Sequence, residues 1–150
     1  MKQAIFNKYL NQMAAYCSRS EKCEFDIRKK LKGTELEINQ VDELINQLIE
    51  NKYIDNQRYA YFLTNDKFKF NKWGKQKIKA YLNQKQISNK LIQNALNAID
   101  IKEYKKTLKE IIDKKAQSTK EQDKYKLKEK IIRNALSKGF EMDLIYDLLA

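Results

Sequence analysis

Isoleucine and leucine recur along the chain at spacings that are typical of amphipathic helices. One pattern consists of Ile, a basic residue, two further residues and Leu, and its three copies begin at Ile27, Ile78 and Ile132. The Ile and the Leu lie four positions apart, which places both on one face of a helix. Each copy therefore predicts a helix with one buried stripe.

A second apolar pattern follows the first in every copy. It consists of Leu-Ile, two other residues and then two apolar residues, and it begins at Leu44, Leu91 and Leu144. The four apolar positions form a broad stripe that would face a core. Because both patterns occur three times in the same order, the sequence predicts three tandem repeats.

Each repeat also contains a leading helical segment, so we expect three helices in each. In the second leading segment an apolar face is expected from Tyr59, Phe62 and Leu63. The three leading segments are expected at approximately 4–18, 57–71 and 103–117.

The predicted fold class is all-α. The chain has no proline and only three glycines, so long helices can run uninterrupted and a turn-rich β fold is disfavoured. Three tandem three-helix repeats would stack into an elongated, curved array. A single compact bundle of eight or nine helices is the alternative. The expected repeats span about 1–56, 57–101 and 102–150.

Several residues mark the expected helix ends. Gly33 and Gly139 stand where a residue with left-handed backbone would end a helix. The middle copy has Gln86 near that position, so its helix must end differently. Two Ser-x-x-Glu sequences fit the spacing of a capping box at a helix start, Ser18 with Glu21 and Ser118 with Glu121.

The net charge of +11 is concentrated in two stretches of the chain. Residues 1–66 carry 10 basic and 10 acidic side chains, whereas residues 67–90 carry eight lysines and no acid. Residues 102–133 add twelve basic and six acidic groups. A localised positive field favours a polyanionic partner, such as nucleic acid or an acidic protein face. Solubility alone is the other explanation of such a composition.

The composition argues against an enzyme, a metal site and a cofactor site. There is no histidine, and the three glycines are too far apart for a phosphate-binding loop. Cys17 and Cys23 cannot complete a zinc site by themselves, so we interpret them as small, partly buried hydrophobic residues. No run of about 18 apolar residues is present, which disfavours a membrane span. We expect neither a membrane nor a small-molecule substrate as a partner. The expected location is the cytoplasm.

The richest candidate site lies between residues 66 and 90, where lysines alternate with aromatic residues. We assign the lysines to binding and the aromatic side chains Phe68, Phe70 and Trp73 mainly to the core. Gly74 is expected to relax the join between two helices. On a helix through 72–82, the spacing would place Lys72, Lys75 and Lys79 on one stripe. The candidate binding residues here are Lys67, Lys69, Lys72, Lys75, Lys77 and Lys79.

Three further arginines are candidates. Alignment of the repeats places Arg28, Lys79 and Arg133 at the same position, where they would form a basic track along one surface. Three ordinary solvated helix positions are the alternative interpretation. Arg19, just before the second expected helix, is the remaining candidate.

Short motifs along most of the chain resemble those of the RecX family. The resemblance covers roughly residues 14–150, and its elements come in the order of the family. Gln86 is a departure, because the family usually has glycine there. The motifs are Arg19-Ser20-Glu21-Lys22-Cys23-Glu24, Asp55-Asn56-Gln57-Arg58-Tyr59-Ala60, Trp73-Gly74-Lys75-Gln76-Lys77-Ile78-Lys79-Ala80-Tyr81-Leu82 and Leu136-Ser137-Lys138-Gly139-Phe140.

The resemblance implies a non-catalytic regulator of homologous recombination and DNA repair. RecX-like proteins bind RecA filaments on single-stranded DNA and inhibit ATP hydrolysis and strand exchange. The implied partners are therefore the RecA filament and single-stranded DNA, and the expected state is a monomer. Two alternatives stay open: a nucleic-acid-binding helical protein that needs no RecA, and a repeat adaptor for an unrelated acidic protein.

Overall fold

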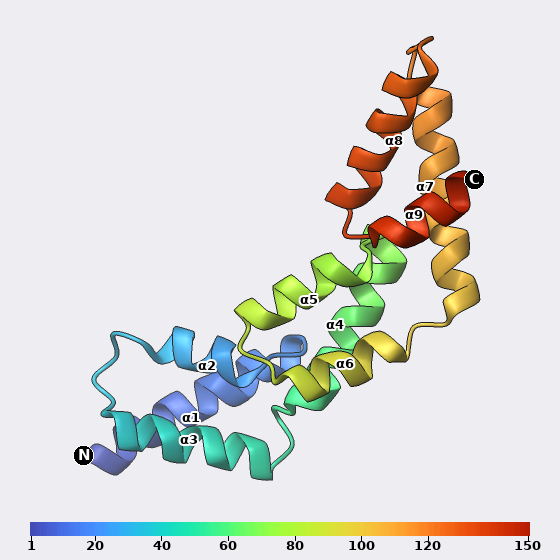
Figure 1. Cartoon of the computed structure of the whole chain (residues 1–150). Coiled ribbons are helices and arrows are strands. Elements are labelled where there is room, and N and C mark those ends of the chain that lie inside the picture. The colour runs from blue at the N-terminus through green and yellow to red at the C-terminus, as the bar shows by residue number, and fades with distance from the viewer.

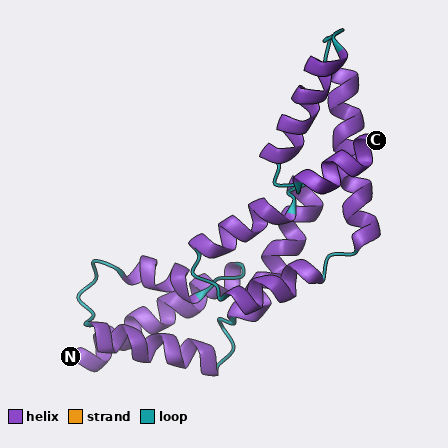
Figure 2. Ribbon diagram, viewed as in Figure 1, coloured by secondary structure: helices purple, strands orange, loops and turns teal.

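The computed structural model describes residues 1–150 and contains nine helices and no strand (Figure 2). The all-α prediction is confirmed, and the three leading helices begin and end within two residues of their expected positions. The helices are α1 (Lys2–Arg19), α2 (Glu24–Leu31), α3 (Ile38–Glu50), α4 (Asn56–Asn71), α5 (Lys75–Gln84), α6 (Asn89–Asn97), α7 (Ile101–Ser118), α8 (Lys124–Ser137) and α9 (Met142–Leu149).

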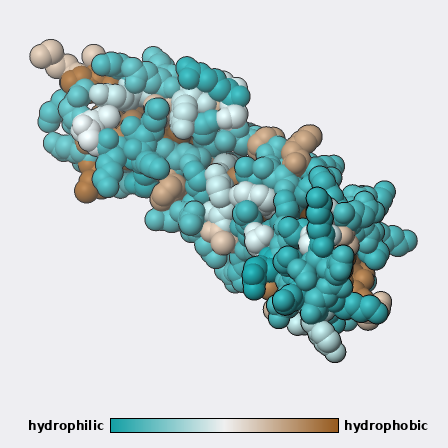
Figure 3. Space-filling model, turned by 90° about the horizontal axis from the view of Figure 1, so that it is seen from above, coloured by the Kyte–Doolittle hydropathy of each residue, from teal (hydrophilic) through white to brown (hydrophobic).

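The nine helices form an elongated array, as expected, and not one compact bundle (Figure 1). Helices α1–α3 lie at one end, α4–α6 occupy the middle, and the antiparallel pair α7 and α8 extends from the other end beside α9. The division into repeats near residues 56 and 101 stays a prediction, and we use it to group the helices. The face seen in Figure 3 is mostly polar, with apolar atoms in separate patches. No helix has the length and apolar character needed to cross a membrane.

The hydrophobic core is divided unequally along the array. One cluster of nine buried residues holds the first repeat together and includes Phe6, Cys17 and Ile45. A second cluster of 18 buried residues runs continuously through the second and third repeats. Cys23 precedes α2, yet its side chain belongs to this larger cluster. The second and third repeats therefore share one core, and the first repeat has a smaller core of its own.

Both predicted capping boxes are wrong. Ser18 lies inside α1 and donates to the carbonyl of Ala14, and Ser118 is the last residue of α7 and donates to the carbonyl of Lys115. Hydroxyls that bond back to the preceding turn cannot cap the next helix. The caps lie five residues further on, at Cys23 for α2 and Asp123 for α8.

A left-handed residue ends the second helix of each repeat. Gly33 and Gly139 have φ of +86° and +98°, and each follows the last turn of a helix. Gln86 adopts φ of +58° at the corresponding place in the middle repeat, so this side chain accepts the conformation that glycine takes elsewhere. The middle helix thus ends in the same way as the other two, and the expectation that it must end differently is wrong.

The second and third repeats meet at a contact between two glycines, which we call the glycine contact (Gly74 and Gly139). The amide of Gly74 donates to the carbonyl of Lys138 at 2.7 Å, and the amide of Gln76 donates to the carbonyl of Gly139 at 2.9 Å. A Cβ on Gly74 would overlap the carbonyl of Gly139, and a Cβ on Gly139 would overlap the backbone of Lys77. Gly74 therefore permits a close backbone approach, which is a different role from the flexible join that we predicted.

Tyr104 adds a second connection at the same place. Its side chain is fully buried, and its ring lies between Phe68 and Phe140, with centroids 5.8 and 5.0 Å away. Its hydroxyl accepts from the amide of Lys75 at 2.8 Å and donates to the carboxylate of Glu141. Burial and the bond to Glu141 both raise the pKa of the tyrosine hydroxyl, which stays protonated and able to donate.

The first and second repeats meet through polar side chains. The Arg58 Nε group donates to both carboxylate oxygens of Glu21 at 2.9 Å, and its Nη2 group donates to the carbonyls of Lys52 and Tyr53. The backbone amide of Arg58 is itself bound by Asp55, the N-cap of α4. One arginine side chain therefore connects the segment before α2, the end of α3 and the start of α4.

A second ion pair crosses the same boundary. Lys85 Nζ lies 2.6 Å from Asp26 Oδ1, while the other oxygen of Asp26 accepts the amide of Cys23. Burial opposes the charge on Lys85, but the bond and charge of Asp26 outweigh it and raise the pKa of the amine. Lys85 therefore stays charged at neutral pH.

We predict that Gly74→Ala destabilises the chain by about 2–3 kcal/mol, because the added methyl group forces the backbone around Gly139 to move. Urea denaturation followed by circular dichroism measures the loss. Gly33→Ala is the matched control, since its Cβ would meet no atom within 4 Å, and it should cost about 1 kcal/mol through its positive φ alone. Equal losses in the two variants would contradict the glycine contact.

The two cysteines allow the two cores to be followed separately. Burial raises the pKa of both thiols, that of Cys23 to about 11, so neither is reactive in the folded chain at neutral pH. Because Cys17 belongs to the smaller core, we expect it to be alkylated at a lower urea concentration than Cys23. Pulsed alkylation with peptide mass spectrometry measures both. Simultaneous labelling would mean that the three repeats unfold as one unit.

Candidate polyanion-binding site

The six predicted lysines lie at the end of α4, in the connection after it and in the first turns of α5. None of them has a carboxylate within 4.0 Å, whereas other basic residues do, including Arg58 and Lys85 at the first repeat boundary. Their charges are therefore available to a partner that is not part of this chain.

Lys67 and Lys77 gather around one aromatic ring. The Lys67 and Lys77 amines lie 5.0 and 4.6 Å from the centre of the Trp73 ring, and Tyr81 packs against the edge of the same ring. Trp73 is half-buried and belongs to the margin of the larger core. The cation–π geometry places both ammonium groups beside a single aromatic side chain.

Lys69 and Lys72 belong to a different surface. Lys69 lies two positions after Lys67 on α4, which is about 200° around the helix. Lys72 follows the end of α4 with left-handed backbone, φ +59°, and lines two neighbouring cavities. Helix α5 begins only at Lys75, so the predicted stripe of Lys72, Lys75 and Lys79 on one helix is wrong.

The remaining lysines of the region have separate surroundings. Lys75 is half-buried, with its amine 5.0 Å from the centre of the Tyr104 ring. Lys79 is half-buried on α5 and has no ion-pair partner. The six lysines thus occupy at least two surfaces that converge on the junction between α4 and α5.

The three arginine candidates are exposed, but they differ in their pairing. Arg28 is bound by Glu24 at 3.0 Å and by Asp42 at 2.9 Å, so two carboxylates already compensate its charge. Arg19 ends α1 and Arg133 lies on α8, and both lack an ion-pair partner. A binding role for Arg19, Arg28 and Arg133 stays a prediction.

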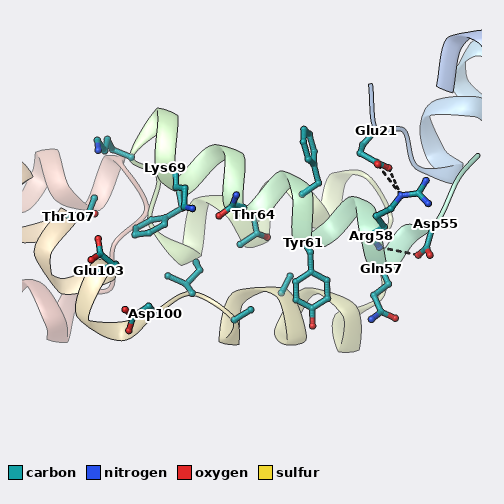
Figure 4. Close-up of a pocket in the computed structure, with 17 residues that line it drawn as sticks. Glu21, Asp55, Gln57, Arg58, Tyr61, Thr64, Lys69, Asp100, Glu103 and Thr107 are labelled. Atoms are coloured by element: carbon teal, nitrogen blue, oxygen red, sulfur yellow. Dashed lines mark hydrogen bonds and ion pairs between the residues drawn. The ribbon is translucent and has the colours of Figure 1, made fainter. Parts of the chain in front are cut away.

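A groove of about 1070 Å³ runs along α4, from the first repeat boundary to the start of α7. Figure 4 shows Arg58 with Glu21 and Asp55 near one end and Lys69, Glu103 and Thr107 near the other. Between them lies Thr64, whose hydroxyl is buried and has no hydrogen-bond partner. The groove has a mixed lining of acidic, basic and aromatic side chains.

The aromatic residues of α4 are more exposed than the sequence indicates. Phe68 is buried as predicted, but Phe70 is 78% exposed, which corrects its assignment to the core. Phe62 is likewise 52% exposed and lines the groove, although we expected it on the apolar face of its helix. Each lies on a side of α4 that no neighbouring helix covers.

A smaller cavity of about 420 Å³ contains basic residues that the sequence analysis did not select. It lies between α7, α8 and Lys72, and three further lysines line it: Lys114, Lys115 and Lys138. The available signal was the excess of basic residues in 102–133, but charge density alone does not tell which lysines of a long helix share a face with those of its neighbour.

Comparison with known families assigns most of the chain. The model described as "RecX, second three-helix domain" matches residues 55–96, and "RecX, third three-helix domain" matches residues 103–149. These matches correspond to α4–α6 and α7–α9.

Sequence relatives carry the same family name. A "Regulatory protein RecX" from Clostridium perfringens (strain 13 / Type A) is 30% identical over 145 residues, which are 95% of this chain and 68% of the relative. Another from Clostridium botulinum (strain Eklund 17B / Type B) is 32% identical over 133 residues, 87% of this chain and 62% of the relative. The chain thus spans about two thirds of the length of these relatives.

Solved structures share the fold. The crystal structure of RecX from Lactobacillus salivarius has a TM-score of 0.87 at 23% identity and covers 96% of this chain and 94% of its own. A second crystal structure of regulatory protein RecX has a TM-score of 0.88 at 23% identity. Because the family models and the relatives agree over most of the residues, the chain belongs to the RecX family.

Proposed function

We propose that this chain regulates recombination by binding RecA filaments on single-stranded DNA and inhibiting their ATP hydrolysis and strand exchange. The observation that carries the proposal is the combination of RecX family membership with a group of lysines at the α4–α5 junction that no carboxylate compensates. Binding requires no catalytic group, and we propose that the chain has none.

The shape of the array supports this proposal. An elongated molecule can contact several successive subunits of a helical filament, and many weak contacts along one chain reinforce each other through their effective concentration. The uncompensated lysines provide attraction to DNA phosphates or to acidic protein surfaces. We further propose that the active form is a monomer.

We predict that the protein lowers the ATPase rate of RecA on single-stranded DNA at near-physiological salt. Titration of the protein into the ATPase reaction, beside a DNA-binding assay without RecA, measures the effect. Inhibition at concentrations that leave free DNA unbound is the expected result, because the filament offers more contacts than DNA alone. An unchanged ATPase with strong, salt-sensitive DNA binding would instead indicate a nucleic-acid-binding protein that needs no RecA.

Charge reversal tests whether the lysines of the α4–α5 junction carry the binding. The triple variant Lys72→Glu, Lys75→Glu, Lys79→Glu should weaken filament binding by at least about tenfold, because lost phosphate contacts reduce affinity steeply at moderate salt. Filament co-sedimentation measures the affinity, and circular dichroism checks the fold.

A control with the same net charge separates local contacts from the overall field. The triple variant Lys2→Glu, Lys29→Glu, Lys32→Glu also changes the charge from +11 by −6 to +5, at exposed positions of the first repeat that have no ion-pair partner. We expect its filament affinity to change by less than about threefold. Equal losses in both variants would place the site elsewhere and leave the lysines as a solvated surface.

A further inference from the structure

The cavity between α7 and α8 differs from the rest of the basic surface in how its lysines are arranged. Four lysines and one acid, Glu110, line about 420 Å³, which is within the usual range of about 300–1,000 Å³ for ligand sites. We call this cavity the lysine cleft. The remaining lining side chains are Thr107, Ile111, Ser118 and Asn134, of which three are polar. The lysines of the cleft are Lys72, Lys114, Lys115 and Lys138.

No carboxylate neutralises these amines. The lining contains three more positive than negative groups, and none of the four lysines has an acidic oxygen within 4.0 Å. Lys109 and Lys130, on the same two helices but outside the cleft, are paired with Asp113 and Glu121. Other lysines of these helices are also unpaired, but those of the cleft face one shared cavity with a single acid among them.

The usual structural role of lysine at a helix end does not account for the cleft. Lysines in the last turn commonly stabilise the carbonyl end of a helix. At the end of α7, the Ser118 and Thr119 hydroxyls already donate to the carbonyl of Lys115, at 3.2 and 2.6 Å. The carbonyl of Lys138 is bound by the amide of Gly74. These carbonyls do not need the lysine side chains, so the amines of Lys115 and Lys138 are free to bind a ligand.

The backbone holds the cleft lysines in place. Lys138 directly precedes Gly139 and is half-buried, so the glycine contact fixes its position. Lys72 lies two residues before Gly74 and adopts left-handed backbone, which is uncommon for a side chain other than glycine and costs about 1 kcal/mol. Lysines from two repeats therefore converge on one cavity whose geometry is set by hydrogen bonds of the backbone.

We infer that the lysine cleft binds the phosphodiester backbone of single-stranded DNA. Ammonium groups bind phosphate oxygens through charge, and the side-chain amide of Asn134 can donate hydrogen bonds to the same oxygens. Phe70 does not line the cleft, but its ring is 78% exposed near the end of α4, shortly before Lys72, and offers a stacking face to a base of a strand that extends beyond the cleft. A stacking face favours DNA over an acidic protein as the ligand. The inference deepens the proposed function, since it assigns a DNA contact to the third repeat.

The test is binding of a fluorescent oligothymidylate by the whole chain in the absence of RecA, measured by anisotropy over a series of salt concentrations. The double variant Lys114→Glu, Lys138→Glu should weaken binding by about tenfold. It should also reduce the slope of log affinity against log salt concentration by about 1.4, because each lost phosphate contact on a single strand removes about 0.7 from that slope. Phe70→Ala should weaken binding by about tenfold without changing the salt dependence, because stacking releases no counterions.

The matched control is Lys124→Glu with Lys126→Glu. Both pairs change the net charge from +11 by −4 to +7, and both control residues are exposed on α8 outside the cleft. We expect the control pair to lower affinity by less than about threefold. If the glutamate pair in the cleft disturbs the circular dichroism spectrum, Lys114→Gln with Lys138→Gln gives the same comparison against Lys124→Gln with Lys126→Gln.

Equal losses in the cleft and control pairs, or no binding of the oligonucleotide by the unaltered chain, would overturn the inference. Unchanged DNA binding with a loss of RecA inhibition would also overturn it, and would assign the cleft to an acidic protein surface. A third outcome separates the two proposals. If the cleft pair loses DNA binding, but the unaltered chain does not change the RecA ATPase, the cleft is supported and the proposed function is refuted.

Discussion

The close approach of two backbones at Gly74 and Gly139 is the constraint on which the rest of the molecule depends. A hydrogen bond from Gly74 to the carbonyl before Gly139 forms only because neither residue carries a side chain. This approach brings the start of α5 against the end of α8, and Tyr104 completes it by accepting from the amide of Lys75. A continuous core through two repeats follows, because Phe68, Tyr104 and Phe140 then stack in one row.

The two boundaries between repeats are therefore held by different physical interactions. Between the second and third repeats, backbone hydrogen bonds and a shared core act together, and both depend on tight packing. Between the first and second repeats, the ion pairs of Arg58 with Glu21 and of Lys85 with Asp26 act beside the buried side chain of Cys23. The side chains of Arg58 and Glu21 are 40% and 25% exposed, so water weakens this pair. We therefore expect the array to be stiffer at the end that carries the lysine cleft than at the end that begins with α1.

Apolar spacing was sufficient to predict the helices, their number and the array, because burial of one face per helix follows directly from periodicity. The predicted caps at Ser18 and Ser118 failed because a serine near a helix end can also bond backward, and spacing cannot distinguish the two. Gly74 and Gly139 were each recognised in a motif, but their contact joins residues 65 positions apart and leaves no periodic trace. The exposure of Phe70 likewise depends on which side of α4 has no neighbour.

The same long-range contact explains why the cleft lysines could not be predicted as a site from the sequence. Lys72 stands two residues from Gly74, and Lys138 stands next to Gly139, so the contact between the glycines brings the two lysines to one cavity. The motifs that resemble the family supply mainly structural residues: Asp55 caps α4, Arg58 joins two repeats, and the glycines join two more. Their contribution to binding is indirect, because they determine where neighbouring lysines lie. A change at either glycine would therefore alter the electrostatic surface without removing a single charge, which distinguishes a site built by packing from one built by charge density alone.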